Sequence, residues 1–76
     1  MNDARRATVR KALELLSECK ELLEEARDGE REAFDNLPEG LRGSENGQRM
    51  ESAADSLEEA VDTLEEIGSE LETVVE

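Results

Sequence analysis

The segment FDNLPEGLRGSENG, residues 34–47, holds the only Phe, the only Pro and three of the five Gly of a 76-residue chain. Pro38 disfavours helical geometry at the residue before it, so a helix that arrives from the N-terminal side is expected to end near Asn36. Backbone freedom for a reversal of the chain comes from three glycines, Gly40, Gly43 and Gly47. Because helix-forming and charged residues dominate on both sides, the segment predicts a hinge between two helices.

Polar side chains at the end of this segment mark the start of the second helix. Ser44 or Asn46 can accept hydrogen bonds from the free N–H groups of its first turn. Glu45 lies in that turn, where the helix dipole favours an acid. We predict a single domain, residues 1–76, made of a helix over about 3–36, a hinge over about 37–45 and a helix over about 46–75.

Apolar residues after the hinge recur with a period of seven. Three columns with this period form one stripe: Met50, Leu57, Leu64 and Leu71; Ala53, Ala60, Ile67 and Val74; and Ala54, Val61, Gly68 and Val75. A stripe of this width is typical of a helix in a bundle and is broader than the seam of a two-stranded coiled coil.

The residues before the hinge carry a less regular stripe with spacings of four and three. Its members are Ala12, Leu16, Cys19, Leu23, Ala26, Glu30, Ala33 and Leu37. The phase of the stripe passes Gly29 unchanged, although a glycine inside a helix costs about 1 kcal/mol. One continuous helix is therefore predicted, with Cys19 packed in the core.

Two helices of similar length joined by a short hinge predict an all-α antiparallel two-helix hairpin, a helical coiled coil. In this arrangement Arg5, Arg6 and Arg10 are expected to lie beside the acids of the C-terminus, Glu70, Glu72 and Glu76. Because two helices share one seam, apolar residues beside it should stay exposed in a monomer and form the interface of a homodimeric four-helix bundle. These residues are Leu13, Leu15, Leu22, Val61 and Val75.

The size of the chain also favours self-association. A domain this small buries only about 60% of its unfolded surface and usually needs a disulfide, a metal or a partner chain. One Cys and no His exclude an internal disulfide and a zinc site of the usual kind. The N-terminus, MNDARRATVRK, has no apolar core of a signal peptide, and no apolar run approaches the roughly 18 residues of a membrane span. We expect a cytoplasmic protein that does not enter the membrane.

Acidic residues dominate the second helix. The net charge is −13, and residues 51–76 hold ten acids and no Lys or Arg. Phosphates would be repelled, so direct nucleic-acid binding by this face is excluded. We predict an acidic face that binds a partner protein, made of Glu51, Asp55, Glu58, Glu59, Asp62, Glu65 and Glu66.

The spacing of these acids suggests one alternative. Ten acids over 26 residues give about one charge per 3.9 Å of helix, close to one phosphate per about 3.4 Å of a DNA strand. A mimic of nucleic acid would occupy the basic groove of a DNA- or RNA-binding host protein. Solubility alone also selects acidic surfaces, which leaves a purely structural, self-assembling helical module as a further alternative.

The hinge is a second candidate for partner binding, through Phe34, Asp35, Asn36 and Leu41. Phe34 and Leu41 are more apolar than a turn requires. They either cap the end of the bundle or offer a small docking surface.

No set of residues for catalysis is apparent, and we expect no enzyme and no cofactor. The chain has no His, Tyr or Trp, so Cys19 has no base to activate it. The carboxylates lie on predicted solvent faces, without the burial that would shift their pKa values toward catalysis. The segment that starts at Asp35 does not match a calcium-binding loop, because Leu37 and Asn46 occupy positions where the loop needs calcium ligands.

The segment EREAFDNLPEGLRGSENGQRMESAADSLEEAVDTLEEI, residues 30–67, resembles small acidic helical-hairpin proteins of phages and prophages. The matching elements are aromatic-Asp-Asn-Leu-Pro-Glu at 34–39, Ser-Glu-x-Gly at 44–47 and the Leu-Glu-Glu-Ala heptads that follow. The resemblance covers roughly residues 12–70, with Asn46 where a charged residue is expected. It implies a mobile-element setting. We therefore expect a non-enzymatic accessory or inhibitory factor that binds a host protein through its acidic helical surface. The alternative is a nucleic-acid mimic that blocks a host defence enzyme.

Overall fold

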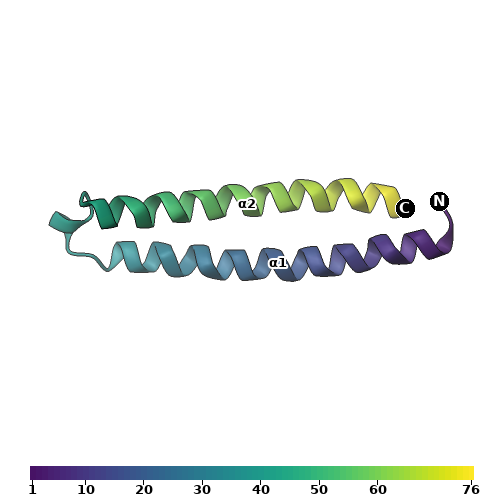
Figure 1. Ribbon diagram of the computed structural model, residues 1–76, viewed down its shortest axis with the longest axis horizontal. Helices are drawn as coiled ribbons and strands as arrows, with labels where there is room; N and C mark the ends of the chain where they lie inside the picture. The colour runs from purple at the N-terminus through teal and green to yellow at the C-terminus, as the bar shows by residue number, and fades with distance from the viewer.

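The computed structural model describes residues 1–76 as two long helices packed side by side (Figure 1). Helix α1 spans Asp3–Asp35 and helix α2 spans Glu45–Val75, with a short 3-10 helix, η1, at Glu39–Leu41 between them. The two helices run in opposite directions, so both termini lie at one end of a rod of 58 × 15 × 14 Å and the hinge lies at the other. The predicted all-α antiparallel hairpin is confirmed.

Each end of α1 is set by a short-range signal in the sequence. The side chain of Asn2 accepts a hydrogen bond from the backbone N–H of Arg5 at 2.8 Å and so caps the first turn. At the other end, the backbone N–H of Asn36 donates to the carbonyl of Glu32 at 3.0 Å. The helix ends there because Pro38 disfavours helical geometry at Leu37.

Ser44 is the residue that caps α2. Its hydroxyl accepts from the backbone N–H of Gly47 at 3.2 Å and donates to the carbonyl of Leu41 at 2.5 Å. Asn46, the other predicted cap, is exposed within the first turn. The guanidinium of Arg42 donates to the carbonyl of Asp35 at 2.8 Å, which ties the hinge to the end of α1.

The hinge glycines do not act as the sequence suggested, since no glycine has a positive φ. Gly47 lies inside α2 and is buried. A Cβ on Gly47 would collide with the carbonyl oxygen of Arg42 and lie 2.8 Å from that of Leu41. Glycine is needed here because the hinge backbone passes directly over the first turn of α2.

The seam of α2, the row of residues that faces α1, follows alternating spacings of three and four. Its members are all buried or half-buried: Gly47, Met50, Ala54, Leu57, Val61, Leu64, Gly68, Leu71 and Val75. Ala54 and Val61 are 2% and 3% exposed. The first and third predicted columns thus face α1, whereas Ile67 and Val74 of the second column remain exposed.

The seam of α1 is rotated slightly from the predicted stripe: it keeps Leu16, Leu23, Glu30 and Leu37, and the other column is shifted by one residue. The half-buried row is Arg6, Val9, Leu13, Leu16, Lys20, Leu23, Arg27, Glu30, Phe34 and Leu37. Leu13 and Phe34 replace Ala12 and Ala33 because larger side chains bury more apolar surface. Lys20 and Arg27 fit the seam because their aliphatic stems pack on it while their charged ends reach acids on α2. The prediction that Cys19 is a core residue is wrong, since Cys19 is exposed.

The same rotation corrects the predicted dimer residues. Val61 lies at the centre of the hairpin itself, and Leu13 and Val75 are half-buried in the seam. Leu15 and Leu22 remain 53% and 65% exposed. Only these two of the five are therefore free to contact another chain.

Neither α1 nor α2 contains a stretch that is both long and apolar enough to pass through a membrane.

Candidate interaction surfaces

The seam separates two sides of the hairpin, and the ion pairs between the helices identify one of them. Arg31 of α1 pairs with Glu58 of α2 at 3.6 Å, so the helix faces that carry these residues lie on the same side. We call this side the charged flank. Its members recur every seven residues: Arg10, Ser17, Glu24 and Arg31 on α1, and Glu51, Glu58, Glu65 and Glu72 on α2.

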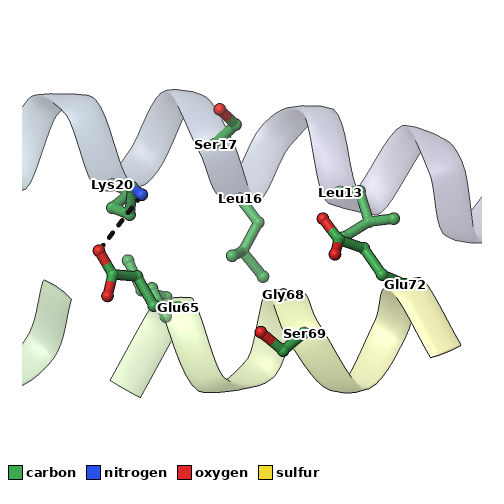
Figure 2. Close-up of a pocket in the computed structure, with 9 residues that line it drawn as sticks. Leu13, Leu16, Ser17, Lys20, Glu65, Gly68, Ser69 and Glu72 are labelled. Carbon is green, nitrogen blue, oxygen red and sulfur yellow. Dashed lines mark hydrogen bonds and ion pairs between the residues drawn. The ribbon is translucent and has the colours of Figure 1, made fainter. Parts of the chain in front are cut away.

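Basic residues in the seam of α1 form ion pairs with acids of α2 on the charged flank. Arg27 donates to Glu58 at 2.6 Å and Lys20 donates to Glu65 at 3.4 Å. Figure 2 shows Lys20 reaching across to Glu65, with Leu16 directed at Gly68. Because Gly68 has no side chain, a shallow groove of about 270 Å³ remains beside Leu16. These pairs set the register of the two helices.

The guanidinium of Arg27 is the one titratable group whose pKa clearly departs from its ordinary value. The pKa is raised, first by the hydrogen bond to Asp28 at 3.0 Å and then by the hydrogen bond to Glu58. The side chain is 16% exposed, because its stem packs in the seam. Arg27 therefore stays charged and holds Glu58 against α1, which is a structural role.

The acids predicted to form one binding face are divided between two roles. Glu58 and Glu65 are engaged by α1. The other five are exposed and have no ion pair within 4 Å: Glu51, Asp55, Glu59, Asp62 and Glu66. We call these five the outer acidic face. A second acidic patch, which was not predicted from the sequence, lies on α1 to one side of Gly29 and is formed by Glu21, Glu24, Glu25, Asp28 and Glu32.

The four predicted hinge residues do not converge on one site. Phe34 and Asp35 line a groove of about 230 Å³ with Glu51 and Asp55. Phe34 is half-buried at the end of the seam, which matches a residue that closes the end of the core. The backbone of Asn36 caps α1, and Leu41 is 51% exposed.

The expected pairing of the basic N-terminus with the acidic C-terminus is wrong in detail. No ion pair within 4 Å joins Arg5, Arg6 or Arg10 to the C-terminal acids, and Arg6 pairs with Asp3 on its own helix. The register set by the Lys20–Glu65 and Arg27–Glu58 pairs places Glu76 about level with Val9. The first turn of α1 therefore extends beyond the end of α2 (Figure 1).

The side opposite the charged flank is nearly free of charge. We call it the uncharged flank: Ala12, Leu15, Cys19, Leu22, Ala26, Gly29 and Ala33 on α1, and Ala53, Ser56, Ala60, Thr63, Ile67 and Val74 on α2. Every one of these residues is exposed or half-buried. Between Ala12 and Ala33 on α1 and between Ala53 and Val74 on α2, Glu70 is the one charged residue in these rows, and Arg5 and Arg49 continue the rows beyond these limits. The sequence signal for this surface is the column Ala12, Cys19, Ala26 and Ala33, which is one of the two columns of the predicted stripe and lies beside the seam.

The exposed side chains of the uncharged flank differ in size between its two halves. Leu15, Leu22, Ile67 and Val74 lie in the half nearer the termini, and each is at least 38% exposed. Residues in the half nearer the hinge are all small: Ala26, Gly29, Ala33, Ala53, Ser56 and Ala60. Nothing in the hairpin lies within 4 Å of a Cβ placed on Gly29. The hairpin itself therefore does not require a glycine at this position.

No family of proteins, curated protein or solved structure was found to match the chain. The described residues also contain no group of three or more Cys, Asp or Glu placed to hold a metal ion. The surfaces of the hairpin are thus the basis for a functional proposal.

Proposed function

We propose that this chain is a non-enzymatic protein-interaction module that binds another protein chain through the uncharged flank. One observation carries the proposal. In a chain of which 41% is charged, an exposed row without any charge runs from Ala12 to Ala33. Exposed apolar patches on soluble proteins mark interaction sites, and neither the fold nor the seam of the hairpin requires this row.

The likeness of the hinge to small acidic phage and prophage proteins supports a phage or prophage origin for this module. There, an accessory or inhibitory factor would act on a protein of the host in the host cytoplasm. The uncharged flank supplies the contact area within the assembly of protein chains, and the outer acidic face remains toward solvent and keeps the assembly soluble.

A capture experiment tests the module. The tagged chain is incubated with nuclease-treated lysate and eluted in steps of rising salt. We expect bound protein to survive high salt, because apolar contacts are not screened, and to be lost from Leu15→Glu/Leu22→Glu. Leu41→Glu is the matched control, since Leu41 is as exposed as Leu15 but lies in the hinge. Equal capture by all three chains would contradict the proposal.

The outer acidic face favours a second candidate, a protein that imitates nucleic acid and blocks a basic groove. Its five acids have no basic partner, and no Lys or Arg follows Arg49 in the chain. This candidate predicts a partner that is released by moderate salt. It also predicts loss of binding in Asp55→Asn/Glu59→Gln/Asp62→Asn/Glu66→Gln.

The matched control for this candidate removes charge from α1 instead, in Glu14→Gln/Glu18→Gln/Glu21→Gln/Glu25→Gln. Both variants lose the same number of acids, so a general effect of net charge lowers binding by both. A specific acidic face predicts that only the α2 variant fails. Full binding by the α2 variant would exclude mimicry.

A further inference from the structure

We infer that the uncharged flank is covered by a second copy of this chain whose hinge lies at the opposite end of the assembly. In this dimer α1 packs antiparallel against α1 of the second copy, and α2 packs antiparallel against α2. The inference rests on the proposed function, that this flank binds protein, and names the partner.

The exposed area of the hairpin supports a partner of this size. A monomeric protein of 8.5 kDa is expected to expose about 4,700 Å², whereas the hairpin exposes 5500 Å². The excess of about 800 Å² equals the area that each partner contributes to a standard protein interface. Only three residues are buried in the hairpin, so further burial is needed for a core of ordinary extent.

The size gradient along the uncharged flank selects the orientation. A two-fold interface brings the same patch of both chains together, so that patch must fit itself. With the second copy reversed end to end, Leu15 lies over Gly29 of the second copy, Ile67 over its Ala60 and Val74 over its Ala53. On either side of the axis the large side chains then meet small ones, and only at the axis does Leu22 meet Leu22 of the second copy. With both hinges at one end, large would meet large at the termini and leave gaps near the hinge.

The two helices independently place the axis of this dimer at one level. Matching Leu15 with Gly29 puts the axis level with Leu22 of α1. Matching Ile67 with Ala60 puts it between Thr63 and Leu64 of α2. The Lys20–Glu65 and Arg27–Glu58 ion pairs set these same positions opposite each other across the seam. One axis therefore satisfies both helices.

The reversed dimer also accounts for residues that the hairpin leaves unexplained. Gly29 becomes the space that receives Leu15 of the second copy. Glu70, the one charge within the flank, falls within one residue of the level of Ser56 of the second copy, whose hydroxyl can donate to it. At the rim, Glu18 falls within one residue of the level of Glu25 of the second copy. Two chains that each carry a net charge of −13 repel, so the dimer is expected to tighten with salt, unlike a charge-driven complex.

Sedimentation equilibrium of the pure chain tests the dimer. We expect a dimer for the wild type and for Leu41→Glu. Leu22→Glu should raise the dissociation constant by about 100-fold or more, because it buries a charge at the axis. Gly29→Leu should do the same while raising helical content, since leucine favours a helix over glycine. A dimer lost through Gly29→Leu therefore cannot be attributed to unfolding.

The orientation has its own test, in which Cys19→Ser/Leu22→Cys is oxidised. Residue 22 of each chain lies at the axis of the reversed dimer, so a disulfide-linked dimer is expected. With both hinges at one end these residues are diagonal in the bundle and stay reduced, which would overturn the orientation. Cys19→Ser/Ser52→Cys, on the outer surface of α2, is the control and should not cross-link.

Failure of this inference and failure of the proposed function give different results. A wild type that is monomeric at every concentration, yet captures a foreign protein through Leu15 and Leu22, would overturn the second copy alone. A monomeric wild type whose capture is unchanged by Leu15→Glu/Leu22→Glu would overturn both. A dimer that Leu22→Glu and Gly29→Leu leave intact would place its interface elsewhere and overturn the inference.

Discussion

Gly47 shows how a single missing side chain fixes the geometry of the hinge. The hinge backbone at Leu41 and Arg42 crosses the first turn of α2 so closely that a methyl group at residue 47 has no room. The hydroxyl of Ser44 bridges the same two segments, because it accepts from Gly47 and donates to Leu41. The hinge is therefore a packed structure, and the angle at which α2 leaves it is defined by these contacts.

Replacing Gly47 with alanine is expected to destabilise the hairpin by about 1–3 kcal/mol, because overpacking outweighs the gain in helix propensity. Thermal or urea unfolding followed by circular dichroism measures the change. Gly43→Ala is the matched control: nothing lies within 4 Å of its Cβ position and its φ is not positive. It should be neutral or stabilise by up to about 1 kcal/mol. Equal effects at both positions would show that Gly47 is not closely packed.

The composition of the hinge predicted that the chain reverses there, but not what each residue does. Turn-forming residues are recognisable because their backbone preferences are local. The close approach at Gly47 depends on where Arg42 lies in three dimensions, which no local preference specifies. Ser44 and Asn46 were equivalent candidates for the cap by type alone, and only the path of the hinge selects Ser44.

Helix α1 carries two rows of residues with the same heptad spacing, one residue apart. The row through Leu13, Lys20, Arg27 and Phe34 faces α2, whereas the row through Ala12, Cys19 and Ala26 faces outward. Periodicity finds both rows and favours the one without charges. The charged row prevails because Lys20 and Arg27 find acids on α2 at the matching level, which the sequence of α1 alone does not reveal.

Because Leu13 faces α2 and Leu15 faces outward, we predict that replacing each with alanine changes the stability of the hairpin by different amounts. Leu13→Ala should destabilise the hairpin by about 1–3 kcal/mol, because the side chain is removed from the seam. Leu15→Ala should change the stability by no more than about 0.5 kcal/mol, since Leu15 is 53% exposed. Both are measured by urea unfolding at low protein concentration, so that association does not contribute. The reverse order would show that the seam of α1 runs through Leu15 instead of Leu13.

The cross-helix ion pairs of α1 should contribute modestly to stability. Arg27→Met keeps an apolar stem in the seam and removes the pairing with Glu58, and a small loss of stability is expected because Glu58 is still partly open to solvent. Because the pKa of Arg27 is raised on folding, its contribution is complete below the ordinary arginine pKa and is lost only as the pH rises beyond it. The stability difference between Arg27→Met and the wild type should therefore stay constant between about pH 7 and pH 9. A difference that vanishes within that range would contradict this role.

The hairpin as a unit was predictable from the sequence, since two helical stretches of matched length and a short hinge leave an antiparallel pair as the simple arrangement. The surfaces were less predictable. Val61 and Leu13 were assigned to a dimer interface but pack within the hairpin, because periodicity does not show which of several adjacent rows two helices share. The uncharged flank is defined by the ion pairs on the opposite side of the hairpin, which join the two helices and are not evident from the sequence of either helix alone.

Cys19 is a natural probe at the centre of the uncharged flank, and its thiol is exposed in the hairpin. The most direct measurement is the rate at which a maleimide modifies Cys19 as the concentration of the pure chain is raised. If a second copy covers the flank, the rate should fall toward that of a protected thiol at high concentration. Leu22→Glu should keep the rate high throughout. A wild-type rate that stays equal to that of Leu22→Glu at every concentration would contradict the covered flank.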